Sequence, residues 1–242
     1  YNNIGADKMK TTREKFLTVV EAEKATGVHY TVKHSGKMEG MQSLSTSCLC
    51  NKYCKNRSIN SELVCSHCYA QRQMKMYKNL NACLERNTEI LTGRILKEAE
   101  IPMINASFFR FESFGDLINV TQVINYFHIC KKNKHVHFAL WTKNPWIIEE
   151  ALETSEKKPS NLQIIYSSPC INDQADPGYD FIDKIFTVYD KDYISAHDVN
   201  INCRAKSCLT CHKCYVKNKT KYNYEIIAYT NGGNAIKSNS VS

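Results

Sequence analysis

Nine of the twelve cysteines in this sequence lie in two short groups. The first group is Cys48, Cys50, Cys54, Cys65 and Cys68, and the second is Cys203, Cys208, Cys211 and Cys214. Thiolates a few residues apart can turn toward one centre, and they are the usual ligands of zinc and of iron–sulfur clusters. A chain of 242 residues can bury a core without disulfides. Metal or redox chemistry is therefore the better interpretation of these cysteines.

The first cysteine group follows the first predicted strand with the spacing C-x-C-x3-C-x10-C-x2-C. Zinc and an iron–sulfur cluster both accept this donor set, so ligand softness does not separate them. A closed structural zinc site can lie anywhere in a fold, whereas this loop lies where an α/β sheet binds its ligand. The position of the group therefore favours an iron–sulfur cluster, with zinc as the alternative.

The second cysteine group places four thiolates within residues 203–214. Four thiolates complete either a tetrahedral zinc site or a four-iron cluster. Because the chain supplies every ligand, the site is expected to be closed, which favours a structural or electron-relay role. His212 lies among these cysteines, and a lone histidine there is more often a surface residue than a fifth ligand.

The elements expected to position these groups alternate between strands and helices. A helix is predicted at 11–26, where apolar residues have helical spacing and Gly27 ends the run. The predicted strands are 41–47, 107–113, 136–142, 162–168 and 185–190, and the later helices are 72–97, 118–131 and 145–155. Alternating strands and helices predict an α/β fold with parallel strands, here a partial (βα) barrel of about five to six strands. Ligands of such sheets bind at the carboxyl ends of the strands.

The predicted organisation has four parts. Residues 1–40 form an N-terminal helix and lead-in, and residues 41–200 form the partial barrel with the first cysteine group. Residues 201–231 form a cysteine-rich metal-binding segment, and residues 232–242 form a flexible tail.

Polar residues follow several predicted strands and form the candidate ligand site. Glu112, Ser113 and Asp116 lie at the end of the second strand, and Gly115 permits close approach of the backbone. The third and fourth strands end at Thr142, Lys143 and Ser167. These carboxylates could hold an ammonium group or a ribose hydroxyl; the alternative is a turn in which Asp116 caps helix 118–131. No Ser/His/Asp order, Walker loop or dinucleotide glycine fingerprint is present, which argues against hydrolase, NTPase and nicotinamide chemistry.

The charge and hydropathy of the chain bear on its partners and location. The net charge of +8 is spread over short runs, so it allows nucleic acid as a partner without a basic stripe that specifies one. No window approaches the roughly 18 apolar residues of a membrane span. We therefore expect no membrane partner and a cytoplasmic location.

Six motifs occur along roughly residues 37–230: LSTSCLCNKYC, VCSHCYA, YKNLNACLERN, FFRFESFGDL, FALWTKNP and CRAKSCLTCHKCY. Together, and in this order, they resemble the bacteriophage "gene product 88" family, which is also found in gut bacterial genomes. The resemblance implies a cytoplasmic protein of a bacterium or a phage-infected host. Members of this family look like distant relatives of radical S-adenosylmethionine (SAM) proteins. In that superfamily three cysteines bind a four-iron cluster, and the remaining iron takes the methionyl group of SAM.

Carried over to this chain, the resemblance implies Cys48, Cys65 and Cys68 as cluster ligands. Cys54 is a fourth candidate, and Cys50 is the least secure. Ser113, Gly115 and Asp116 would replace the Gly-Gly-Glu segment that meets the amine of SAM. The spacing departs from the usual C-x3-C-x2-C, and a closed site of four cysteines would leave no iron for SAM.

Two functions follow from these observations. The first is an iron–sulfur protein, a radical-SAM-like enzyme with a [4Fe–4S] cluster at the barrel mouth and an auxiliary site at Cys203, Cys208, Cys211 and Cys214. The alternative is a non-enzymatic module that is stabilised by zinc or an iron–sulfur cluster and binds nucleic acid.

Overall fold

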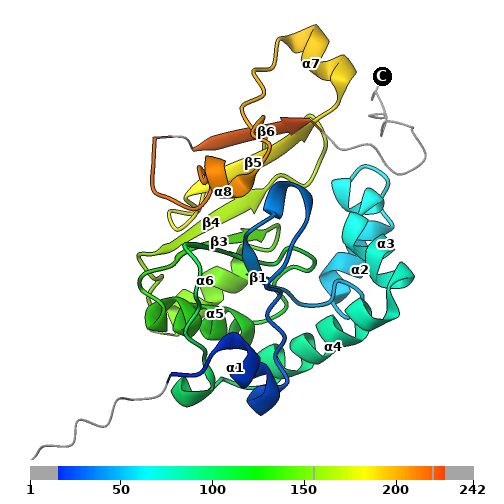
Figure 1. Cartoon of the computed structure of the whole chain (residues 1–242). Coiled ribbons are helices and arrows are strands. Elements are labelled where there is room, and N and C mark those ends of the chain that lie inside the picture. Colours follow the sequence, from blue (N-terminus) through cyan, green and yellow to red (C-terminus); the bar gives the residue numbers. More distant parts are fainter. Residues whose placement is uncertain (1–15, 155, 220, 227–242) are drawn as a thin grey trace, which may run out of the picture.

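The computed structural model describes residues 16–154, 156–219 and 221–226 of the chain. Its centre is a six-stranded sheet whose spatial order equals the order of the strands in the sequence, and every neighbouring pair is parallel (Figure 1). The strands are β1 (Gln42–Leu44), β2 (Phe108–Phe111), β3 (His137–Thr142), β4 (Leu162–Ser167), β5 (Lys184–Tyr189) and β6 (Tyr222–Ile226). Their carboxyl ends therefore lie along one edge of the sheet.

Eight α-helices accompany the described part of the sheet. They are α1 (Val19–Thr26), α2 (Lys52–Ser58), α3 (Tyr69–Met76), α4 (Lys78–Gly93), α5 (Val120–Lys132), α6 (Trp146–Glu153), α7 (Lys191–His197) and α8 (Cys208–Cys211). Helices α4, α5 and α6 connect successive strands and pack on one face of the sheet, where Phe109, Phe111 and Phe138 meet Leu91 and Tyr126 in the main core. Alternate residues of each strand supply this core, as the pleat requires.

The other face of the sheet carries a second, smaller core. Met41, Ala139 and Ile165 point to this side, and Tyr215 from the C-terminal segment packs on them. The side chains of Cys208 and Cys214 contact the same cluster. The second cysteine group is therefore held against the sheet, and does not project away from it.

The expected fold class is confirmed, since the chain is α/β with one parallel sheet. The sheet is open, because β1 and β6 each pair with a single neighbour, so a barrel is not confirmed. All five predicted strands are present within a few residues, and the prediction missed β6. The predicted helix 72–97 is wrong as a single element: the backbone of Tyr77 is extended and separates α3 from α4. The predicted tail 232–242 lies outside the described residues.

The N-terminal helix is shorter than predicted. It begins at Val19 because the Thr18 side chain accepts from the Glu21 amide, and the Glu21 carboxylate in turn accepts from the Thr18 amide. It ends at Gly27, whose φ of 83° is the left-handed conformation that favours glycine. Of the predicted span, residues 11–15 are outside the described part. Within that part, no helix combines the length and the apolar character needed to cross a membrane.

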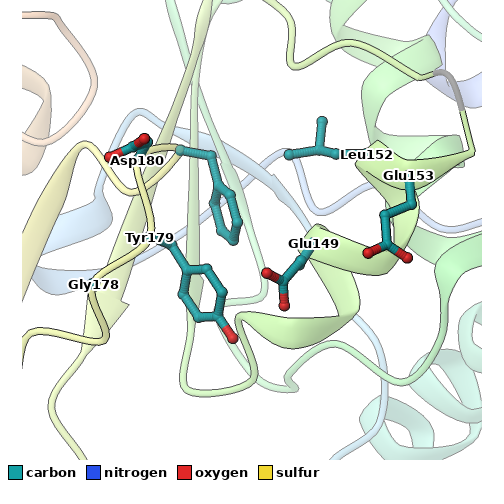
Figure 2. Close-up of a pocket in the computed structure, with 7 residues that line it drawn as sticks. Glu149, Leu152, Glu153, Gly178, Tyr179 and Asp180 are labelled. Carbon is teal, nitrogen blue, oxygen red and sulfur yellow. The ribbon is translucent and has the colours of Figure 1, made fainter.

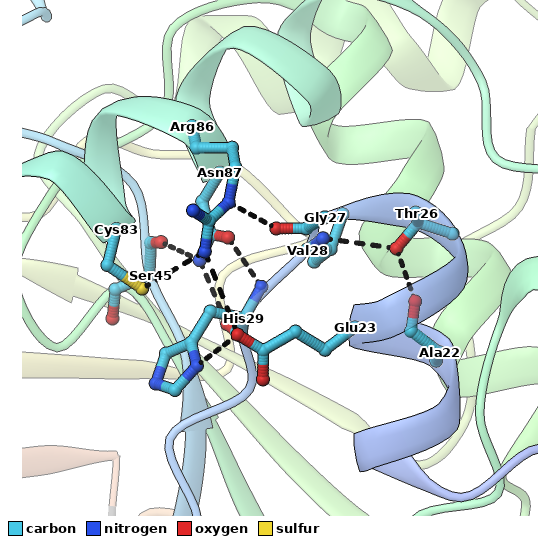
Figure 3. A network of polar contacts seen from close by, with 10 residues as sticks. All are labelled: Ala22, Glu23, Thr26, Gly27, Val28, His29, Ser45, Cys83, Arg86 and Asn87. Carbon is cyan, nitrogen blue, oxygen red and sulfur yellow. Dashed lines mark hydrogen bonds and ion pairs between the residues drawn. The ribbon is translucent and has the colours of Figure 1, made fainter.

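A polar network joins α1 to α4 (Figure 3). Nδ1 of His29 lies 2.9 Å from Oε1 of Glu23, and Arg86 approaches the same carboxylate at 3.7 Å. The backbone of His29 pairs with the Asn87 amide group in both directions. A hydrogen bond with Cys83 and the contact with Glu23 outweigh burial and raise the pKa of His29 to about 9.

We predict that this network makes stability depend on pH. Because the folded pKa of His29 lies above the unfolded value of about 6.5, its stabilisation is complete below pH 6.5 and is lost as the pH rises through 9. The pair is partly exposed, so we expect a loss of only about 1 kcal/mol of unfolding free energy. Urea denaturation across this pH range should show a loss that His29→Gln removes and Asn87→Ala retains. An unchanged pH dependence in His29→Gln would contradict the assignment.

Candidate functional site

A cavity of about 1220 Å³ lies at the carboxyl ends of β2, β3 and β4. All six residues predicted to bind a cofactor line it, together with six of the eight predicted metal ligands. These residues are Ser113, Gly115, Asp116, Thr142, Lys143 and Ser167, and Cys65, Cys68, Cys203, Cys208, Cys211 and Cys214. Cys48 and Cys54 are not among the lining residues. The fold thus brings the two cysteine groups and the strand-end polar residues to one cavity, although the groups are far apart in the sequence.

Three short elements after β1 position the first cysteine group. Asn51 caps α2 by accepting from the amides of Tyr53 and Cys54, which fixes Cys54 in the first turn. Cys65 lies in a 3₁₀ turn at Val64–His67, and Cys68 directly precedes α3. Local capping and turns, and not strand geometry, therefore hold these thiols.

Four thiols of this group lie close enough to influence one another. The hydrogen bond with Cys68 raises the pKa of Cys48, and burial with the charges of Asp116 and Cys65 raises the pKa of Cys54. The hydrogen bond with Cys48 lowers the pKa of Cys68 to about 6, with help from the first amides of α3 and from Lys143. A thiolate at Cys68 is thus the preferred charge state of the group. Cys48 is buried, and its Sγ lies 3.5 Å from Sδ of Met74.

Cys50 differs from these four in that its side chain is exposed to solvent. All twelve cysteines are free thiols, so no disulfide competes for them. In the part of the chain that the structure describes, no three His, Cys, Asp or Glu side chains adopt the arrangement of a bound metal ion.

The second cysteine group is gathered by α8 and the chain on either side of it. Burial and the neighbouring Cys203, Cys208 and Cys211 raise the pKa of Cys214 to about 12. The ring of His212 stacks on Phe108 with a centroid distance of 5.2 Å. His212 is exposed, as predicted, and one face of its ring packs on the sheet.

Glu112 anchors the turn that follows β2. It has a φ of 55°, in the left-handed region that non-glycine residues rarely adopt. Its carboxylate accepts from the Thr46 amide at 3.2 Å, from Nε2 of Gln122 at 2.8 Å and from the Tyr126 hydroxyl. Burial raises the pKa of Glu112 to about 7. A Cβ at Gly115 would lie 2.5 Å from this carboxylate and 2.7 Å from the Thr46 carbonyl oxygen, so only glycine fits there.

Asp116 connects the ends of β2 and β3. Its Oδ1 accepts from Oγ1 of Thr142 at 2.5 Å and from the Leu117 amide at 2.8 Å. Its Oδ2 accepts from the Lys143 amide at 3.0 Å, and burial raises its pKa. The alternative in which Asp116 caps the next helix is wrong, because Asn119 is the N-cap of α5. Asp116 thus holds the ends of β2 and β3 together at Ser113–Asp116, the polar rim of the cavity. Because both carboxylate oxygens already accept hydrogen bonds, only part of its accepting capacity remains for a ligand.

Ser113 is held in the same way by its neighbours. Its Oγ lies 2.8 Å from Oγ of Ser45, its amide donates to that oxygen at 3.0 Å, and its carbonyl accepts from the Tyr69 hydroxyl. Ser113 and Asp116 are therefore preorganised by hydrogen bonds to residues of other elements and loops.

Arg110, Trp141 and Tyr215 are among the cavity residues that were not predicted. Arg110 lies on β2 and its guanidinium stacks over the ring of Trp141 on β3, 4.1 Å from the centroid. Tyr215 meets the same tryptophan edge-on at 5.7 Å. The sequence does contain a signal that could have identified Arg110. It lies within the apolar strand 108–111, where the alternation of side chains directs it to the face opposite the main core.

A second hollow, of about 440 Å³, lies between α6 and the loop before β5 (Figure 2). Glu149, Glu153 and Asp180 surround it with Tyr179. None of the predicted site residues lines it, so the larger cavity is the candidate site.

Comparison with known proteins gives one match. The model of the family described as "Gene product 88" matches residues 16–228. No curated protein matches the chain. No solved structure matches it either.

Proposed function

The chain belongs to the gene product 88 family, and we propose that it is an iron–sulfur protein that acts as a radical-SAM-like enzyme. The observation that carries the proposal is the single cavity lined by thiols of both cysteine groups and by the polar rim at Ser113–Asp116. A metal site that opens on a ligand cavity at the strand ends suits catalysis better than a structural role.

The donor set of the first group suits a cluster. Its four thiols are free, and Cys48 and Cys68 hydrogen-bond to each other, although no three of the four, all of which the structure describes, adopt the arrangement of a bound metal ion. Thiolates are the usual ligands of iron–sulfur clusters. Cys65 and Cys68 border the cavity, whereas Cys48 and Cys54 lie behind it. Cys48, Cys65 and Cys68 would be the ligands of a cluster with one open iron, and Cys54 would be the fourth ligand of a closed one.

A bound cluster with an open iron would supply one electron to SAM and a coordination position for its methionyl group. The chain supplies orientation. Lys143 carries a positive charge between Cys68 and Asp116, as its effect on the pKa of each shows. It is suited to a ligand carboxylate, while the unused lone pair on Oδ2 of Asp116 is suited to an ammonium.

The alternative function rests on the same four thiols. If Cys48, Cys54, Cys65 and Cys68 all bind one zinc or one cluster, no position remains for SAM. The chain would then be a non-enzymatic module whose positive net charge allows nucleic acid as the partner. Which thiols bind the metal therefore decides between the two functions.

The test is to purify the protein without oxygen and to measure iron, acid-labile sulfide and zinc. We expect brown protein with iron and sulfide. On reduction and addition of SAM, we expect a changed electron paramagnetic resonance signal and formation of 5′-deoxyadenosine. Asp116→Asn should weaken the response to SAM at unchanged iron content. Colourless protein with stoichiometric zinc would contradict the enzymatic proposal. An iron-containing protein whose electron paramagnetic resonance signal does not change with SAM, and which forms no 5′-deoxyadenosine, would contradict it as well.

A further inference from the structure

The floor of the cavity carries a cation without a counter-ion. Arg110 forms no ion pair with any carboxylate in the part of the chain that the structure describes, and its Nε is buried without a hydrogen-bond partner. Its Nη1 donates to the thioether sulfur of Met38 at 3.6 Å. A guanidinium prefers planar oxyanions as partners, because two N–H groups can bind two oxygens at once.

A second unpartnered donor lies beside it. The hydroxyl of Tyr215 is buried without a hydrogen-bond partner, and only 2% of this residue is exposed. Arg110 and Tyr215 contact the same ring, Trp141, from β3. A buried donor without an acceptor costs free energy, so two of them side by side indicate a missing acceptor.

We propose that Arg110 and Tyr215 bind the oxyanion of a small acidic substrate, either a carboxylate or a phosphate ester. The sulfur of Met38 occupies the place where a substrate oxygen would accept from Nη1 of Arg110. Substrate binding therefore requires the Met38 side chain to change its rotamer, which an unbranched methionine does readily. The ring of Trp141 stacks on the face of the Arg110 guanidinium. The N–H groups at the edge of the guanidinium are therefore directed away from the ring and can donate to a substrate.

The inference also gives the second cysteine group a role in recognition. Tyr215 directly follows Cys214, and both pack on Ala139 and Ile165 of the sheet. A metal at this group would fix the position of the tyrosine hydroxyl relative to Arg110. The inference rests on the proposed function for the presence of a substrate, and it is distinct from the SAM position near Ser113–Asp116.

The test is anion binding to the metal-loaded protein, read from Trp141 fluorescence in a Trp146→Phe background. Inorganic phosphate and acetate are titrated at constant ionic strength against chloride. We expect a saturable change with phosphate if the substrate is a phosphate ester, or with acetate if it is a carboxylate. Arg110→Gln should raise the Kd at least about tenfold, and Tyr215→Phe about threefold or more, since each removes a donor to the anion.

Arg72→Gln is the matched control, because it removes one positive charge from an exposed residue of the same cavity. It should change the Kd less than about twofold, as expected for a screened surface charge. If Arg110→Gln does not fold, Tyr215→Phe decides, since it keeps the ring. The proposal is overturned if neither anion binds saturably, or if Arg72→Gln weakens binding as much as Arg110→Gln. Anion binding requires no SAM chemistry, so the two proposals can fail separately.

Discussion

Replacing Cys68 by alanine should remove the metal of the first site and abolish the response to SAM. Cys68 is the thiol that its surroundings favour as a thiolate: Cys48, the first amides of α3 and Lys143 all lower its pKa. A thiolate is the ligand form of cysteine, so Cys68 is the residue of the group that is most readily available to bind a metal. If each group holds a four-iron cluster, iron and sulfide should fall to about half of the wild-type content.

Cys50→Ala is the matched control for this experiment. It makes the same substitution in the same cysteine group, but at the one thiol of the five whose side chain is exposed. Its iron content and its response to SAM should equal those of the unaltered protein. If Cys68→Ala keeps all its iron, or if Cys50→Ala loses as much, the thiols that converge in the structure are not the ligands.

The comparison of Cys54→Ala with Cys68→Ala then separates the two candidate functions. In an open site, loss of Cys54 should leave three ligands and retain the response to SAM. In a closed site, Cys54 is a ligand equal to the others, and its loss should release metal as Cys68→Ala does. The Cys54→Ala variant therefore tests the alternative, non-enzymatic module, because only that function requires Cys54 as a ligand.

Sequence patterns located the strands and the strand-end residues because these depend on local signals. The apolar strands, their β-branched and aromatic residues and the polar residues after them identify β1 to β5 without tertiary information. The strand β6 was missed although its sequence, Tyr-Asn-Tyr-Glu-Ile, alternates apolar and polar residues as strands do, because residues 201–231 were assigned as a whole to the cysteine-rich segment. The break at Tyr77 was missed because the apolar pattern continues through it.

The composition of the cavity could not be predicted in the same way. Which thiols of the first group converge depends on the cap at Asn51 and on the turns before α3, and loop geometry leaves little trace in spacing alone. The approach of Tyr215 to Arg110 joins residues about a hundred positions apart through the packing of the C-terminal segment on the sheet. Such a contact follows from topology, and no local pattern carries it.

Replacing Cys214 by serine should unfold the C-terminal segment from the sheet. Cys214 is half-buried and contacts the small core of Met41, Ala139 and Ile165, where Tyr215 is packed. Metal binding by four thiolates contributes about 10 kcal/mol or more to folding in small zinc domains, so one ligand of four carries about 3 kcal/mol. In a domain of this size that loss corresponds to a decrease in Tm of about 6 to 12 °C.

The variant also has a local readout, which distinguishes release of the segment from a general loss of stability. Trp141 should become more exposed as Tyr215 leaves it, so its fluorescence should shift to the red together with the loss of metal. Cys83→Ser is the control, because Cys83 lies on α4, outside both groups, and should keep the metal and the Trp141 spectrum. A Cys214→Ser protein with unchanged metal content and Tm would show that this segment packs on the sheet without a metal. The position of Tyr215 would then depend on its own aromatic contacts with Phe108 and Trp141.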